Sequence, residues 1–217
     1  MSPSDRYAPG WWPGVRPFPE VAPMEPAFGF TVLNPFGSAI VHGPKRIENR
    51  GDEPPIRLRS RAFWILVHTG ARLYPGVTRE DFTAPRSTVD PSPCEGDLGL
   101  GDDEEAPPLW PDCPPFAAFE PRAIIGAARV VGSVADGKIR AVDLNEWAVE
   151  GQAHWILDPT TIVLPESFPW PAGELGLWAP KASDPDPKRA AMGARLIEAR
   201  DAVRRAMADP RNHRRAG

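Results

Sequence analysis

The sequence has very little cysteine, with only Cys94 and Cys113 among its 217 residues. Neither has a second cysteine or a histidine at the spacing that a metal site needs. Two isolated cysteines are also too few for the disulfide framework of a small secreted domain. We therefore expect free thiols and neither a metal nor another cofactor.

Long apolar segments are missing as well. No run reaches the ~18 apolar residues that cross a bilayer, and residues 1–13 contain no apolar stretch of signal-peptide length. On this basis we expect a soluble, cytoplasmic protein that does not associate with membranes. The sequence carries no information about its oligomeric state.

An excess of positive charge is the third missing feature. The chain has 25 lysines and arginines against 29 acidic residues, which gives a formal net charge of −4. This balance excludes a protein that binds nucleic acid through bulk positive charge, although it leaves room for a local basic surface.

Proline, in contrast, is abundant, with 29 residues. It concentrates in two segments without periodicity: residues 1–27, which we expect to form an extended arm, and residues 71–120, which we expect to form an acidic insert. Trp11 and Trp12 in the arm either pin it to the rest of the protein or offer a stacking surface for a base. The acidic tract of the insert is either solvated or folds over a basic rim as a mimic of phosphate.

The segment from Pro35 to Arg50 combines an apolar helix, a turn and a charged strand. Gly43-Pro44 cannot continue a helix. A strand that starts at Lys45 would place Glu48 and Arg50 on one face. We expect the ammonium of Lys45 to project, exposed, at the mouth of a cleft.

Several β-like segments follow. The apolar run from Ala62 to Val67 predicts a buried strand that ends at His68. Alternating arginines, including Arg59 and Arg61, precede it and would line one rim of a barrel. The other predicted strands lie at residues 28–33, 122–134, 138–142, 153–157, 160–165 and 174–178.

The run Gly43-x-Lys45-x-x-Glu48-x-Arg50, together with this order of strands, resembles the ASCH family of PUA-like β-barrels. The resemblance covers roughly residues 28–180 and implies an α+β fold, a small mixed β-barrel with a few helices. Residues 181–217 would follow it as a basic amphipathic helix and tail, with apolar positions at Met192, Leu196, Ala199, Val203 and Met207.

The resemblance implies binding of RNA or of a modified nucleobase or nucleoside in a cleft around this motif. Lys45 would contact phosphate, and Glu48 would hold the guanidinium of Arg50. Trp155 would offer a stacking plane, with Trp64 and Trp178 as further aromatic candidates. The remaining candidate binding residues are Arg59, Arg61, His68 and His154.

An enzyme is the alternative. Some ASCH proteins resemble amidohydrolases of acetylated cytidine that use the motif lysine and a threonine three residues later; others are described as ribonucleases. Here Glu48 stands at the threonine position, which weakens the amidohydrolase alternative. If the protein is an enzyme, Lys45 and Glu48 are the candidate catalytic residues, and His68 or His154 could assist a ribonuclease.

A purely structural role is also open for the motif. Glu48 and Arg50 would then form a buried ion pair that only stabilises the barrel, and Lys45 would be idle. Histidines at such positions are also often satisfied core residues, which applies to His68.

Overall fold

The computed structural model describes residues 15–19, 28–73, 121–140, 144, 147–170 and 176–215. Most of the predicted arm, most of the predicted insert and both cysteines lie outside these residues. The strands are β1 (Arg16–Pro17), β2 (Phe28–Asn34), β3 (Ile47–Arg50), β4 (Phe63–Leu73), β5 (Ala123–Val134), β6 (Ala153–Leu157), β7 (Thr160–Pro169), β8 (Leu177–Trp178) and β9 (His213–Arg215). The helices are α1 (Phe36–Val41), the 3-10 turn η2 (Ile56–Leu58), α3 (Pro187–Met207) and the 3-10 turn η5 (Pro210–Asn212).

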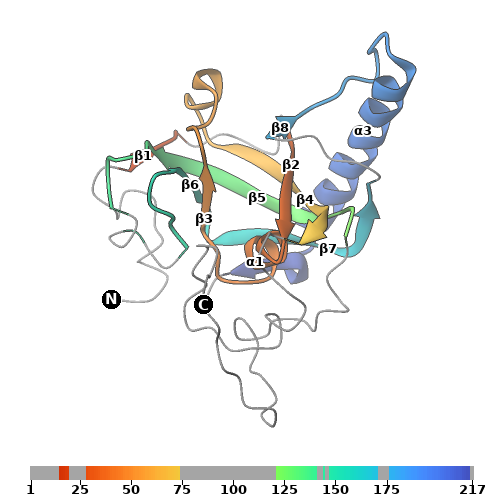
Figure 1. Cartoon of the computed structure of the whole chain (residues 1–217). Helices are drawn as coiled ribbons and strands as arrows, with labels where there is room; N and C mark the ends of the chain where they lie inside the picture. Colours follow the sequence, from red (N-terminus) through yellow and green to blue (C-terminus); the bar gives the residue numbers. More distant parts are fainter. Residues whose placement is uncertain are drawn as a thin grey trace, which may run out of the picture.

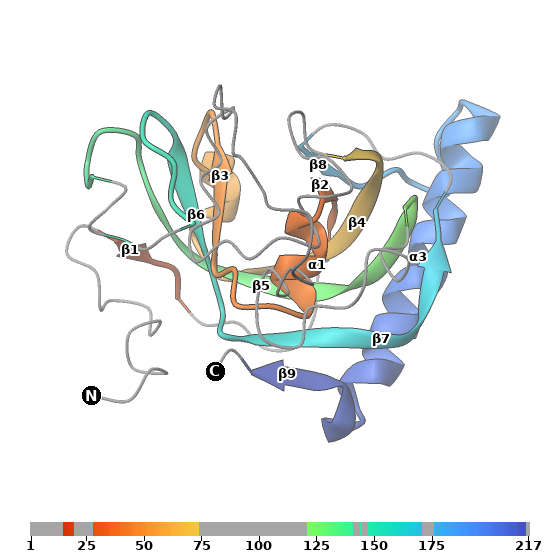
Figure 2. The same ribbon diagram turned by 60° about the horizontal axis from the view of Figure 1, so that its bottom comes forward.

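The strands form one mixed sheet in the order β3-β6-β5-β4-β2-β8 (Figure 1). Only the β2–β4 pair is parallel among the strand pairs of the described residues, and the others are antiparallel. The sheet curls into a half-barrel, which Figure 2 shows as a trough with β3 and β6 on one wall and β2 and β4 on the other. The protein is therefore an α+β fold with a barrel-like sheet.

The curl follows from the central strand β5, which changes partner along its length. Its first half pairs with β7, and its second half pairs with β6. Register shifts interrupt both pairings, between Ile124 and Gly126 and between Val130 and Gly132. Such irregularities bend a strand and increase its twist, so the sheet can turn back on itself.

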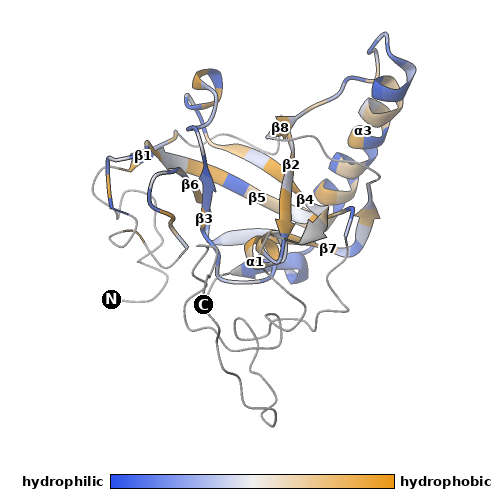
Figure 3. Ribbon diagram, viewed as in Figure 1, coloured by the Kyte–Doolittle hydropathy of each residue, from blue (hydrophilic) through white to orange (hydrophobic). Residues whose placement is uncertain are grey.

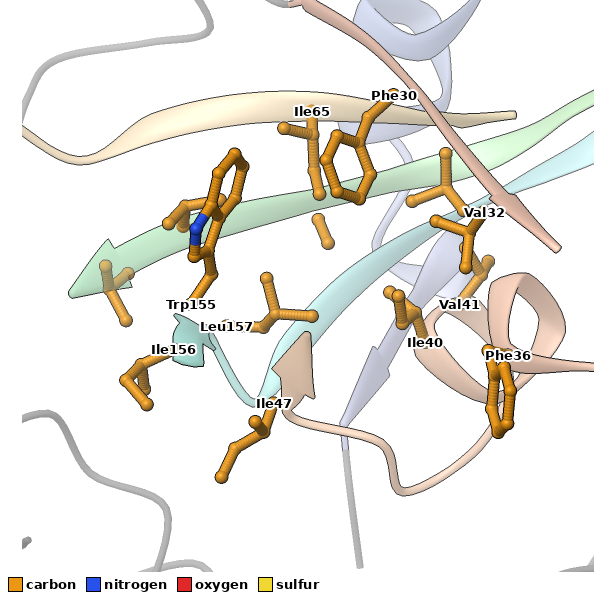
Figure 4. Close-up of a cluster of buried hydrophobic side chains, with 14 of the residues drawn as sticks. Phe30, Val32, Phe36, Ile40, Val41, Ile47, Ile65, Trp155, Ile156 and Leu157 are labelled. Carbon is orange, nitrogen blue, oxygen red and sulfur yellow. The ribbon is translucent and has the colours of Figure 1, made fainter. Parts of the chain in front are cut away.

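The sheet has an inner and an outer face, each with its own apolar cluster. The inner face, inside the trough, packs against α1; Figure 4 shows Phe30, Ile65, Trp155 and Leu157 of this cluster. The outer face packs against α3 through residues that include Leu66 and Ile162. Figure 3 shows apolar residues on both helices and along the central strands. Because both faces are covered, the central strands are apolar almost throughout.

Helix α3 begins as its sequence predicts. The carboxylate of Asp186 accepts a hydrogen bond from the backbone N–H of Lys188 (2.8 Å), and Pro187 occupies the first helical position. The buried line of the helix is Gly193, Leu196, Ala199, Val203 and Ala206. The predicted apolar stripe is confirmed at its three central positions, whereas Met192 and Met207 are only partly buried.

Four sequence predictions need correction. Strand β3 begins at Ile47, so Lys45 precedes it. Strand β4 continues through His68 to Leu73, so the histidine lies within the strand and residues 71–73 belong to the sheet. Strand β7 runs on to Pro169. Residues 138–140, predicted to start a strand, lie in a turn region. For the three strands, long-range pairing sets the boundary, which local sequence cannot reveal.

In the part of the chain that the structure describes, no helix is both long and apolar enough to cross a membrane. The same residues contain no group of three or more histidine, cysteine or acidic side chains placed to hold a metal ion.

Candidate functional site

The candidate site is a charged triad on the inner face, formed by Lys45, Glu48 and Arg50. One oxygen of the Glu48 carboxylate accepts a hydrogen bond from the ammonium of Lys45, and the other forms an ion pair with the guanidinium of Arg50, each at 3.1 Å. The side chains are 3%, 8% and 25% exposed, respectively. A single carboxylate thus bridges two cations, one deeply buried and one that reaches solvent.

Hydrogen bonds to backbone carbonyl groups fix Lys45 in addition to its ion pair with Glu48. Its N–H donates to the carbonyl of Ala39 in α1 (3.1 Å), and its ammonium donates to the carbonyl of Ile47. The rings of Phe36 and Trp147 lie 5.7 and 6.0 Å from the ammonium, within the range of cation–π attraction. The expectation of an exposed lysine is therefore wrong, because the chain between α1 and β3 folds the side chain inward.

Burial lowers the pKa of the Lys45 ammonium from its usual value. Glu48 opposes this effect through its charge and hydrogen bond, while the positive charge of Arg50 adds to it. Within the triad, one negative charge faces two positive charges. The site thus carries an excess positive charge in surroundings where charge is poorly solvated.

The side chain of Arg50 in β3 reaches across the trough to strand β2. Its guanidinium donates to the backbone carbonyl of Thr31 in β2 (3.1 Å) and lies 4.1 Å from the centre of the Phe30 ring. Strands β3 and β2 are not neighbours in the sheet, so this contact joins the two walls. The Nε atom of Arg50 is buried and has no hydrogen-bond partner among the described residues.

The neighbouring Arg46 is 1% exposed and ties α1 to the start of β3. Its guanidinium donates to the carbonyl oxygens of Ile40 (2.9 Å) and Lys45 (2.8 Å). Arg46 was not among the predicted site residues. Its sequence neighbours gave no signal, because its role depends on the fold of the turn between helix and strand.

Trp155 shares the inner face with the triad, directly across from Glu48 in the β3–β6 pair. Its indole N–H donates to the carbonyl of Asp52 (2.9 Å), and its ring lies 5.4 Å from that of Phe30. It is 5% exposed. Trp155 therefore packs in the core beside the triad, and it does not present an open stacking plane.

His154 lies on the face of β6 opposite to that of Trp155, although the positive charge of Lys45 is close enough to help lower its pKa. Its Nδ1 atom is 2.9 Å from the side-chain oxygen of Asn49, which also accepts from the N–H of Val149 (3.1 Å). The Asn49 amide donates to the carbonyl of Trp147 (2.7 Å). Burial is the main cause that lowers the pKa of His154. This histidine and asparagine hold the loop that carries Trp147, and His154 makes no hydrogen bond with the triad among the described residues.

His68 is also separated from the triad, because it lies on the outer face. Its Nδ1 atom is 3.1 Å from the hydroxyl of Thr31, which accepts from the indole N–H of Trp178 at the same distance. Burial lowers the pKa of His68 to about 4, and the nearby backbone of Trp170 opposes this in part. His68 is a neutral, buried histidine at neutral pH.

The two predicted rim arginines do not reach the triad either. Arg59 forms an ion pair with Glu53 (2.9 Å) and donates to the carbonyl of Pro54. Arg61 is exposed. Of the eight predicted binding residues, the structure brings four together on the inner face: Lys45, Glu48, Arg50 and Trp155.

Sequence reasoning missed Phe30 and Trp147, which line the site from other elements. Phe30 follows Gly29 in β2, and Trp147 lies about a hundred residues beyond the motif. Only the curl of the sheet brings them to the triad, so no local pattern could have identified them.

No protein-family model matches this chain, and a search of curated proteins found no match.

Proposed function

We propose that the protein binds RNA or a modified nucleobase or nucleoside at the triad, and that it is a PUA-like protein of the ASCH type. Arg50 is the member that reaches solvent, so its guanidinium is the proposed contact for the ligand. Glu48 orients this guanidinium. The buried ammonium of Lys45 adds a second positive charge that attracts an anionic ligand.

The observation that carries the proposal is the excess positive charge of a site that is largely buried. A pair made of one acid and one base would be enough to stabilise the fold. A second buried cation adds a desolvation cost that the same carboxylate cannot fully offset. A phosphate or a polarised carbonyl oxygen of a ligand would balance this charge.

The surroundings also favour a nucleic-acid ligand. The guanidinium is planar, is stacked on Phe30 and is held by Glu48 and the Thr31 carbonyl, so its direction is fixed before a ligand arrives. Such a fork recognises phosphate and base edges through paired hydrogen bonds. Phe36 and Trp147 add aromatic surface beside the charged groups.

Two variants test the proposal: Lys45→Met and Arg50→Met. Each removes one cation and leaves a one-to-one ion pair with Glu48, so the fold should persist. We expect the affinity for a short single-stranded RNA to fall about tenfold or more, since a hydrogen bond to a charged group contributes ~1.5–3 kcal/mol. Fluorescence anisotropy at several salt concentrations measures this.

Arg57→Ala is the matched control, because it removes an exposed positive charge from η2, away from the triad. If one phosphate is neutralised at the triad, both triad variants should also reduce the slope of log K against log salt by ~0.7. Equal RNA binding by wild type and both triad variants would refute the proposal. A salt-insensitive interaction lost in the triad variants would indicate a neutral base or nucleoside as the ligand.

The alternative is a hydrolase that acts on RNA or on a modified nucleoside, and the lowered pKa of Lys45 favours it. A lysine that loses its proton more readily is a better base or nucleophile. This alternative predicts that wild type cleaves RNA or releases acetate from acetylated cytidine, and that Lys45→Met does neither. Chromatography of the products separates turnover from binding alone.

A further inference from the structure

We propose that Asn49 is a positioning residue for the candidate site, because it fixes Trp147 against the ammonium of Lys45. Trp147 then acts as a shield that keeps water away from this charge. The inference rests on the proposed function and deepens it, since the shield determines how strongly Lys45 attracts a ligand that binds at Arg50.

Asn49 lies in β3 between two members of the triad, Glu48 and Arg50. Because side chains alternate along a strand, its amide points to the opposite face, where His154 of β6 is its partner in the register. Strand β3 is the last strand in the sheet order, so a loop can pass around its free edge. The loop before β6 does so: its backbone bonds Asn49, while the Trp147 ring reaches the ammonium that pairs with Glu48.

Three polar contacts converge on the Asn49 amide. Its nitrogen donates to the backbone carbonyl of Trp147 (2.7 Å), and its oxygen accepts from the N–H of Val149 (3.1 Å). These two contacts fix which way the amide faces, because only its nitrogen donates and only its oxygen accepts. The oxygen therefore also faces Nδ1 of His154 (2.9 Å), which carries the donated proton. The amide thus clamps the loop on either side of residue 148.

The Trp147 ring covers one side of the Lys45 ammonium. Its centre lies 6.0 Å from Nζ, and the ring of Phe36 in α1 lies 5.7 Å away. Trp147 is 6% exposed and Lys45 is 3% exposed. Charges that water does not reach are screened less and attract an anion more strongly. The shield would therefore strengthen ligand binding without contacting the ligand.

The variant Asn49→Leu removes the clamp and leaves the triad side chains unchanged. It deprives three groups of their partner: the carbonyl of Trp147, the N–H of Val149 and Nδ1 of His154. Buried polar groups that lose a partner favour a local opening that gives them to water. We therefore expect the loop to move and the Trp147 ring to leave the ammonium. The second variant, Trp147→Leu, removes the shield itself.

Labelling of the full chain with acetic anhydride, followed by mass spectrometry, measures whether a reagent reaches Lys45. Three exposed lysines serve as internal references: Lys138, Lys181 and Lys188. Burial lowers the pKa of Lys45, which by itself would speed its reaction, so slow labelling reports the shield. In wild type we expect Lys45 to react at least about tenfold more slowly than the references. In Asn49→Leu and Trp147→Leu it should approach their rate.

Binding of a short single-stranded RNA is then measured for the same variants, under conditions where circular dichroism shows each to be folded. The affinity should fall about threefold to tenfold in both, because water screens the exposed ammonium. The double variant should bind no more weakly than Trp147→Leu, since Asn49 acts through Trp147. His68→Gln is the control: it alters a buried side chain on the outer face and should change neither labelling nor binding.

The inference is overturned if Lys45 of wild type is labelled as fast as the reference lysines, or as slowly in both variants as in wild type. It is also overturned if Arg50→Met weakens RNA binding while Asn49→Leu and Trp147→Leu bind as wild type does. If Arg50→Met leaves RNA binding unchanged, the proposed function fails, and the shield is judged by the labelling rates alone.

Discussion

The inner and outer faces of the sheet both bury polar side chains, but they stabilise them in different ways. On the inner face Glu48 holds two charged side chains, Lys45 and Arg50. On the outer face the hydroxyl of Thr31 connects two neutral side chains, His68 and Trp178. The difference shows which groups need a counter-charge and which need only a hydrogen-bond partner.

Strand β2 contributes to both faces through adjacent residues. Phe30 points inward and lies against Arg50, whereas Thr31 contacts His68 and Trp178 on the outer side. Alternation along a strand explains how one short segment supports two unlike clusters. It also means that a change on one face should leave the other largely intact, and the following predictions use this separation.

The largest effect is expected for Glu48→Ala. This change leaves two cations on the inner face without their carboxylate, and breaking a buried pair at one partner costs about 3–5 kcal/mol. Urea denaturation measures the loss. Asp201→Ala is the matched control, since Asp201 also pairs with an arginine but its side chain is 46% exposed, and it should cost ~1 kcal/mol or less. Equal losses in the two variants would contradict the buried triad.

The next largest effect is a loss of stability at acidic pH that arises from His68 on the outer face. The folded pKa of His68 is about 4, below its ordinary value of 6.5. Between these values the unfolded chain binds a proton that the folded protein does not, so stability falls as pH drops from 6.5 towards 4. At 1.36 kcal/mol for each pKa unit, His68 contributes up to about 3 kcal/mol to this loss.

Urea midpoints of wild type and His68→Gln, measured at pH 7 and at pH 4.5, check this prediction. The variant should show a smaller decrease between the two pH values. His42 and His154 also have lowered pKa values, so some pH dependence should remain in the variant. Identical pH profiles for the two proteins would show that His68 is not held neutral by the fold.

A smaller effect is expected for Gly29→Ala. A Cβ atom at this position would lie 2.2 Å from atoms of the Trp178 ring, so the indole would have to move. Overpacking of this kind costs about 1–3 kcal/mol. Gly51→Ala is the control, because its new methyl group would meet nothing within 4 Å. In a Trp178→Leu background the cost of Gly29→Ala should shrink, which a double-mutant cycle measures.

The smallest effect on stability is expected for Lys45→Met. The apolar replacement fits the rings around the ammonium, and Glu48 keeps Arg50 as its partner. Replacing part of a buried charge network with an apolar residue is often neutral or stabilising, so the change should stay within about 1 kcal/mol. A much larger loss in urea denaturation would mean that Lys45 serves the fold, and the charge argument for ligand binding would lose its basis.

The secondary structure could largely be predicted from the sequence. The apolar β-like segments at 28–34, 123–134 and 153–157, and the capped helix after Asp186, appear where local composition places them. Charge spacing also identified Glu48 and Arg50 as neighbours on one face, because alternation along a strand is a local property.

Only the tertiary structure decided which predicted site residues meet. The burial of Lys45, the separation of His68 from the triad, the position of His154 on the face opposite to Trp155, and the approach of Phe30 to Arg50 all depend on tertiary contacts. The curl of the sheet arises from pairings between distant strands and from register shifts in β5. Sequence determines the periodicity of each strand, whereas the energies of long-range pairing and burial determine which faces come together.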